Sequence, residues 1–213
     1  SIQMLIAEAE VPPSLGRTIL EAFDELEAAA PPSRRPLCIS MRSSAIGEDA
    51  TLSFAGQYLT VLNVPRERVL GEYKNVVASL FSPRAIAYRL HMGIPFHEAA
   101  MAVACLEMIP ARASGVLYTR HPVNPFDDRM LIQAVRGLGP YAVEGIVPPD
   151  HYVFEKSDPP RLVEKRPGDQ AVRLIPLPGG SVAEQEVPAE ERRLPSLSDG
   201  QAAELAAAAR RLE

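Results

Sequence analysis

The chain has 213 residues, of which 46% are hydrophobic, so it can bury a substantial core as one large domain or two small ones. Its formal net charge of -5 argues against a general binder of nucleic acid or of anionic membranes, although a local basic pocket for a phosphate stays compatible with it. No apolar stretch reaches the roughly 18 residues of a membrane span, and the first residues lack the pattern of an export signal. Cys38 and Cys105 lie in apolar runs without C-x-x-C spacing, which favours buried free thiols and a cytoplasmic location over a disulfide or a zinc site.

The first half of the chain alternates helical and β-prone patterns. Ser14 is a candidate cap for the first helix, and the run "PPSRRP" ends it. The first strand delivers Arg42 and Ser43 at its C-terminal end, where a polar loop opens. In the second strand, alternate residues from Tyr58 to Asn63 are expected to share a face. The predicted elements are a helix over 14–29, a strand over 37–41, a strand over 58–64, a helix over 65–81 and a helix over 83–92.

The second half is mainly β-prone. Residues 101–135 hold three such runs separated by turn signals, which predict an antiparallel meander. Further short strands are expected over 151–156, 161–166 and 171–177, and residues 178–200 have the composition of a linker or surface excursion.

A last helix is predicted from Ser198, which forms a capping-box pattern with Gln201. Its apolar face is made by Ala202, Leu205, Ala206, Ala209 and Leu212. Because this helix stops without a C-terminal glycine and its apolar stripe is unfinished, we expect the chain to be cut from a longer protein.

The run "SMRSSAIGEDATLSFAGQYLTVLN" over 40–63 raises two alternatives. Small residues let backbone N–H groups approach an anion, and Arg42 can offer a bidentate fork to phosphate oxygens. Composition alone favours an ordinary surface loop, since the run matches neither G-x-x-x-x-G-K-[ST] nor G-x-G-x-x-G. Glu48 and Asp49 are expected to be solvated or capping residues and are assigned no chemistry.

The histidines, serines and cysteines form no recognisable metal-binding or catalytic motif in the sequence. The four histidines, His91, His97, His121 and His151, share no short spacing, which disfavours a metal cluster, and His91 is expected at the surface. A G-x-S-x-G elbow and an activated cysteine are both missing from the sequence. Lys74, Arg84 and Arg89 are interpreted as solvated helix charges.

Four collinear segments carry a family resemblance over about residues 15–155. They are "MRSSAIGEDATLSFAGQYLTVLNV", "ASLFSPRAIAYRLHMGI", "LEMIPARASGVLYTRHPV" and "GLGPYAVEGIVPPDHYVF". In this order they resemble the signatures of the phosphoenolpyruvate synthase, pyruvate phosphate dikinase and rifampin phosphotransferase family. The resemblance implies an α+β fold: a partial ATP-grasp-like nucleotide-binding domain over 1–213, with an antiparallel sheet and flanking helices. In it, 156–197 would be irregular strands and linker, and 198–213 the start of a C-terminal helix.

The resemblance also implies a function. In this family the domain transfers a phosphoryl group from ATP to a histidine on a separate swivelling domain, and a further domain passes it to pyruvate or another small acceptor. Both of those domains would lie outside this chain, and no nucleic acid or membrane partner is implied. We therefore expect the chain to bind ATP, to need Mg²⁺ held by ligands outside it, and to be inactive alone.

Site residues carry over position by position from the resemblance. Arg42 matches the phosphate-contacting arginine and is the candidate catalytic residue. The other candidates are Ser43, Ser44, Gly56, Gln57 and Thr60, in or beside the loop that covers the phosphates, and Glu107, Met108 and Ile109, in the hinge whose backbone receives the adenine edge.

The chain also departs from the family pattern. The lysine-bearing "GGKG" segment is expected upstream of residue 1, the D-I-E-W-x-x and L-Q-x-R-P elements are expected after Glu213, and no T-x-G-G-x-x-x-H segment is present. Leu106 replaces the hinge glutamine, Gln133 stands at a frequently acidic position, and Pro140 replaces the glutamate of G-L-G-E. These changes motivate an alternative, a degenerate module for nucleotide sensing or protein interaction without turnover.

Overall fold

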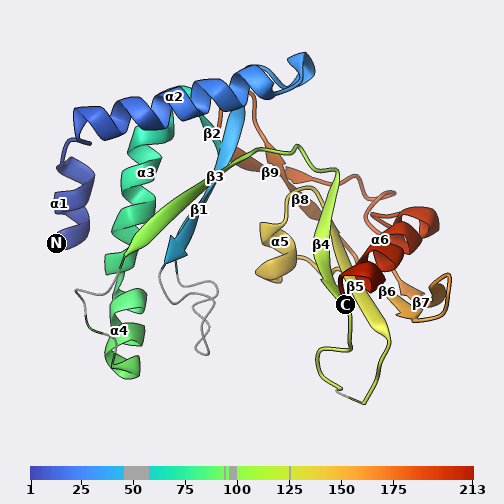
Figure 1. The fold of residues 1–213 in the computed structure, drawn as a ribbon. Helices are drawn as coiled ribbons and strands as arrows, with labels where there is room; N and C mark the ends of the chain where they lie inside the picture. The colour runs from blue at the N-terminus through green and yellow to red at the C-terminus, as the bar shows by residue number, and fades with distance from the viewer. Residues whose placement is uncertain (46–57, 94, 96–99, 125) are drawn as a thin grey trace. The chain divides into compact units, whose positions relative to one another are not determined.

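The computed structural model describes residues 1–45, 58–93, 95, 100–124 and 126–213 (Figure 1). The chain divides into two compact units. The first comprises Ser1–Ile109 and Leu177–Ser181, and the second comprises Pro110–Pro176 and Val182–Glu213. Helices and antiparallel strands occur in both, which agrees with the predicted α+β class. Within the described ranges, no helix is long and apolar enough to cross a membrane.

The first unit is built on an antiparallel sheet with β1 (Cys38–Ala45) between β2 (Thr60–Pro65) and β3 (Met101–Glu107). Helices cover one face of this sheet (Figure 1). The helical segments are α1 (Ile2–Glu8), α2 (Pro13–Ala29), η1 (Pro32–Arg34), η2 (Arg66–Arg68), α3 (Val69–Ala78), η3 (Ser79–Phe81) and α4 (Pro83–Met92).

The core of this unit follows from the alternation of β1. Ile39 and Met41 are buried, and they pack in one cluster with Phe23 of α2 and Val76 of α3. Burial of each such side chain contributes about 2 kcal/mol before entropy is counted. Since successive strand residues point to opposite sides, Arg42, which follows Met41, is directed to the other, exposed face.

Several local predictions for this unit are corrected. Ser14 does not cap α2, because the helix begins at Pro13 after Pro12 and no side chain caps it. The first strand is longer than predicted, so Arg42 and Ser43 lie inside β1 and not at its end. The helices predicted over 14–29, 65–81 and 83–92 are confirmed in outline.

Two of the three supposedly solvated cations have structural roles. Lys74 Nζ donates to the carbonyls of Ala7 at 2.6 Å and Ala9 at 3.1 Å, at the C-terminal end of α1. Arg89 is buried, donates to the carbonyl of Leu80, and lies over the Phe81 ring. Only Arg84 of the three is exposed as expected, and so is His91.

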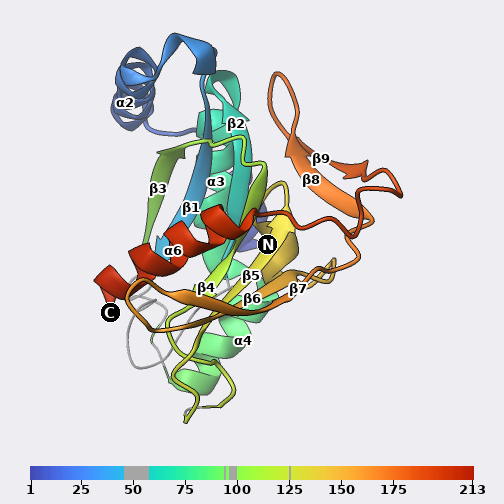
Figure 2. The same ribbon diagram turned by 90° about the vertical axis from the view of Figure 1, so that its right-hand side faces the viewer.

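The second unit contains a sheet in the order β4 (Ala113–Tyr118), β5 (Met130–Arg136), β6 (Asp150–Glu155) and β7 (Arg161–Arg166), together with a hairpin of β8 (Val172–Pro176) and β9 (Val182–Glu186). Its helices are α5 (Pro140–Val143) and α6 (Asp199–Leu212). Figure 2 shows α6 lying across one face of the four-stranded sheet.

The α6 interface uses small residues against large ones. Ala202, Ala206 and Ala209 are buried against a cluster that includes Tyr152 and Phe154. The predicted capping box is confirmed, since Ser198 Oγ accepts from Gln201 N at 3.2 Å while Ser198 N donates to Gln201 Oε1 at 2.9 Å. The rest of the predicted apolar face is not buried: Leu205 is 44% exposed and Leu212 is 87% exposed.

The predicted meander over 101–135 is wrong for its first strand and confirmed for the other two. The first of its strands, β3, pairs with β1 over seven residue pairs from Ile39↔Glu107 to Ala45↔Met101, inside the first unit. The other two, β4 and β5, pair with each other in the second unit, and the chain passes between units at Ile109 and Pro110. Hydrophobic patterning identifies a strand but does not name its partner.

Residues 178–200 were predicted to be a linker or a surface excursion, and the linker alternative is wrong. The segment contains β9, which pairs with β8, and its Val187 is buried. Ser196, near its end, donates its backbone N–H and its hydroxyl to the carboxylate of buried Asp150.

The cysteines are both free, as predicted, but Cys105 is exposed and Cys38 is only partly buried. Burial of the thiol nevertheless raises the pKa of each above its ordinary value.

Candidate functional site

Arg42 and Thr60 stand opposite each other on β1 and β2. Residues paired across antiparallel strands project to the same side, so both belong to the face that the helices leave uncovered. Both are exposed, and Arg42 makes no hydrogen bond or ion pair with the described part of the chain. None of the described residues therefore occupies the donors of this guanidinium.

The neighbours of Arg42 on the sheet are small. On the β3 side Arg42 stands opposite Ala104 and Ser44 stands opposite Ala102, so the β3 residues paired with these two carry little bulk. Ser44 shares the face of Arg42, whereas Ser43 is opposite Val103 on the side of the core. The structure thus groups Arg42, Ser44 and Thr60 and directs Ser43 elsewhere.

The remaining loop candidates, Gly56 and Gln57, lie outside the described residues, as do Glu48 and Asp49.

The hinge candidates lie at the end of β3. Glu107 pairs with Ile39, and its carboxylate is 2.8 Å from Arg34 Nη1. Met108 is buried and donates its backbone N–H to the carbonyl of Cys38 at 2.9 Å, so this donor already serves the sheet. Ile109 is 60% exposed and its N–H makes no hydrogen bond to any described residue. Of the three backbone N–H groups, that of Ile109 is the best placed to donate a hydrogen bond to a ligand.

The three departures from the family pattern fall in different places. Leu106 is 49% exposed and pairs with Ser40, which puts it on the face of Arg42. Gln133 is in β5, opposite Val116 and His151. Pro140 is the first residue of α5.

The described residues offer little to a metal ion. Within them, no group of three or more His, Cys, Asp or Glu side chains is close enough to hold one. Burial, followed by the charge of Arg166, lowers the pKa of His151 below its ordinary value. The described residues fit an anion beside Arg42 and do not by themselves fit Mg²⁺.

Asn63 of β2 does not have the regular strand conformation that the sequence predicts. Asn63 was predicted on a regular strand, but it is buried, has a φ of 56° and interrupts the alternation of β2. The signal was an asparagine inside a β-prone run, because asparagine is depleted in strands and enriched in the left-handed region.

Comparison with known proteins bears on the whole chain. The family model "Pyruvate phosphate dikinase, AMP/ATP-binding domain" matches residues 1–213. The chain belongs to this family. The order of motifs that suggested the resemblance is therefore confirmed as the mark of a pyruvate phosphate dikinase AMP/ATP-binding domain.

Curated relatives of this dikinase-type domain are named phosphoenolpyruvate synthases. The chain is similar to one from Aeropyrum pernix, at 39% identity over 159 residues, covering 74% of the chain and 19% of the relative. It is 36% identical to a probable phosphoenolpyruvate synthase of Methanothermobacter thermautotrophicus, covering 100% of the chain and 31% of the relative. It is 33% identical to the enzyme of Escherichia coli, covering 100% of the chain and 28% of the relative. The chain thus spans less than a third of each of these relatives.

Proposed function

We propose that this chain is the ATP-binding part of a cytoplasmic phosphoenolpyruvate synthase-like phosphotransferase, and that Arg42 holds the phosphates of ATP. The observation that carries the proposal is the exposed pair of Arg42 and Thr60, opposite each other on a sheet face with small neighbours. Family membership supports the choice of an adenine nucleotide over other anions.

The chemistry assigned to these residues is positioning and charge neutralisation. Phosphoryl transfer develops charge on the transferred oxygens, and an arginine fork can hold two of them in a fixed plane. Ser44 and Thr60 add hydroxyl donors on the same face. Glu107, Met108 and Ile109 would receive the adenine edge, with the Ile109 N–H as donor, and the loop with Gly56 and Gln57 would cover the phosphates. When bound, Mg²⁺ would neutralise phosphate charge, held by ligands outside this chain.

For the whole protein, we propose that the phosphoryl group passes from ATP to a histidine on a swivelling domain, and then to pyruvate or another small acceptor. The chain alone would bind nucleotide without turnover. The domain assignment of the whole of 1–213 to one partial ATP-grasp-like domain, with the motifs in 15–155, belongs to the same proposal.

The test is transfer of label from γ-labelled ATP to the whole protein that carries this chain, beside an Arg42→Ala variant. We expect acid-labile, base-stable label on the protein and a rate lower by about a hundredfold in the variant, since a charge-stabilising donor is removed. Arg84→Ala, which removes an exposed arginine of α4, is the matched control and should label normally.

A second candidate is a nucleotide sensor or protein-interaction module without turnover. It is favoured by Leu106, whose apolar side chain occupies the face of Arg42 where the family pattern has an amide. A folded protein that binds ATP in calorimetry but never becomes labelled would support this candidate and exclude the first.

A further inference from the structure

The strand β2 contains an extra residue. Ile39 of β1 pairs with Val64 and Met41 pairs with Val61, so Leu62 and Asn63 together stand opposite the single residue between them, Ser40. This is a β-bulge, and its second residue, Asn63, has a left-handed φ of 56°.

The bulge exchanges the two faces of β2. Val64 and Val61 both pack into the core, although three positions separate them and a regular strand would place them on opposite sides. As a result Thr60 reaches the open face opposite Arg42. In a regular strand with Val64 still paired to Ile39, Val61 would oppose Arg42 and Thr60 would turn toward the core.

Three hydrogen bonds hold Asn63 in this conformation. Its side-chain amide donates to the carbonyls of Leu177 at 2.8 Å and Ser181 at 2.5 Å, and its own carbonyl accepts the Ser181 N–H at 3.0 Å. These residues belong to the segment Leu177–Ser181, which is part of the first unit. Gly180 lies so close to Pro65 that a Cβ there would be 2.7 Å from the proline ring. Asn63 is only 4% exposed, and its amide adds a second donor to each carbonyl, since Leu177 O also accepts the Gly180 N–H and Ser181 O also accepts the Leu177 N–H.

We infer that Asn63 is a positioning residue for the phosphate site: through the bulge it sets the strand register that places Thr60 opposite Arg42. The inference rests on the proposed function. Asn63 itself would not contact the nucleotide, and it would act through Arg42 and Thr60, which would make that contact. Its effect is therefore specific to the phosphates of the ligand.

Three variants of the whole protein distinguish an effect on the register of β2 from an effect on the stability of the fold. Asn63→Val disfavours the left-handed conformation, because a β-branched residue is strained there. Asn63→Gly removes the amide but adopts that conformation freely. Deletion of Asn63 removes the extra residue, so that Leu62, Val61 and Thr60 become regular partners of Ser40, Met41 and Arg42. Leu62→Val, at the adjacent bulge position, is the matched control.

Calorimetry with ATP and with adenosine, together with cross-strand NMR contacts between Arg42 and its partner, is the measurement. We expect Asn63→Val to lose contacts between Arg42 and Thr60 and at least about tenfold in ATP affinity, with adenosine affinity unchanged. Asn63→Gly, the deletion and the control should keep the contacts and stay within about threefold of the original ATP affinity.

Other outcomes overturn the inference. An unchanged register in Asn63→Val, or an equal loss of ATP and adenosine binding, would remove the positioning role. If Asn63→Val does not fold, the deletion decides, since loss of ATP affinity with Arg42 still opposite Thr60 would contradict it. Failure of the proposed function appears separately: unmodified protein that does not bind ATP, or an Arg42→Ala variant that binds it normally, overturns both.

Discussion

The carboxylate of Asp150 accepts two hydrogen bonds from Ser196, which lies 46 positions later in the sequence. The backbone N–H of Ser196 donates one and its hydroxyl donates the other, and each is 2.6 Å long. The other oxygen of Asp150 accepts the N–H of Gly168 at 2.8 Å. Asp150 is 1% exposed, and so it fastens two otherwise irregular segments to β6 from inside the second unit.

Asp150→Asn should therefore destabilise the second unit. An amide can accept at only one of the two oxygen positions, which leaves buried donors unpaired at a cost of about 2–4 kcal/mol in the free energy of unfolding. Urea unfolding followed by circular dichroism measures it. Asp169→Asn is the matched control, because Asp169 meets an 83% exposed Arg193 and should cost less than about 1 kcal/mol. Equal losses in the two variants would contradict the assigned role of Asp150.

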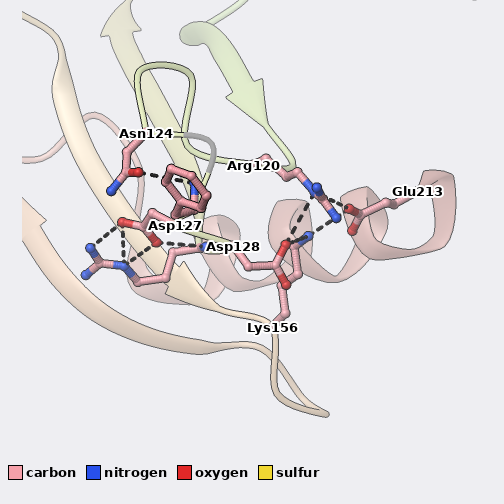
Figure 3. Close-up of polar contacts among 8 residues, drawn as sticks. Arg120, Asn124, Asp127, Asp128, Lys156 and Glu213 are labelled. Atoms are coloured by element: carbon pink, nitrogen blue, oxygen red, sulfur yellow. Dashed lines mark hydrogen bonds and ion pairs between the residues drawn. The ribbon is translucent and has the colours of Figure 1, made fainter.

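A charge cluster joins the β4–β5 connection to the end of α6 (Figure 3). Lys156 Nζ lies 2.9 Å from Asp128 Oδ1 and 2.7 Å from Glu213 Oε1, while Arg120 Nε lies 3.4 and 3.7 Å from the same two oxygens. The hydrogen bond from Lys156 is the main reason that the pKa of Asp128 lies below 3.8.

The sign of the pH dependence follows from that shift. A carboxylate with a depressed pKa in the folded state contributes stability above its unfolded value of 3.8, and loses it as the pH falls through the lower folded value. Asp128→Asn should thus lower the melting temperature slightly near neutral pH and have no effect in strong acid. Asp158→Asn is the control, since Asp158 makes no ion pair with a described residue. A difference that persists unchanged into strong acid would refute the prediction.

Tyr141 offers a spectroscopic test of the contact between α5 and β9. Its hydroxyl donates to Glu184 Oε2 at 2.6 Å, and this bond is the main cause that raises the pKa of Tyr141 to about 12. Since the shift is upward, its contribution to stability is complete below 10.0 and is lost as the pH rises through about 12. Tyrosinate absorbance, with Tyr141→Phe subtracted, should show the transition move back toward 10.0 in Glu184→Gln. An unchanged transition would mean that the bond does not form in solution.

The α6 interface should not tolerate added volume. Ala206 is fully buried against the second sheet, so Ala206→Leu would force side chains or the helix to shift, at a cost of about 1–3 kcal/mol. Thermal unfolding of this variant beside Ala208→Leu, a partly exposed position of the same helix, measures the effect with equal helix propensity. If both variants unfold at the same temperature as the unmodified protein, α6 does not pack as described.

Local chemistry in the sequence determined much of the secondary structure. Apolar spacing located α2, α3 and α6, and the Ser198–Gln201 capping box set the start of α6, because these signals act within a few residues. The order of the family motifs likewise needed no coordinates, and it pointed to Arg42 and its neighbours before their geometry was known.

Only the tertiary structure decided which strands pair and which polar groups are buried. β3 joins β1 and not β4, and Arg89 and Asp150 lie in the interior, because pairing and burial depend on residues far away along the chain. The face that Thr60 occupies depends on a single left-handed residue, Asn63, held by a segment more than a hundred positions later. An alternating pattern has a period of two wherever it is read, whereas one inserted residue reverses every side chain beyond it.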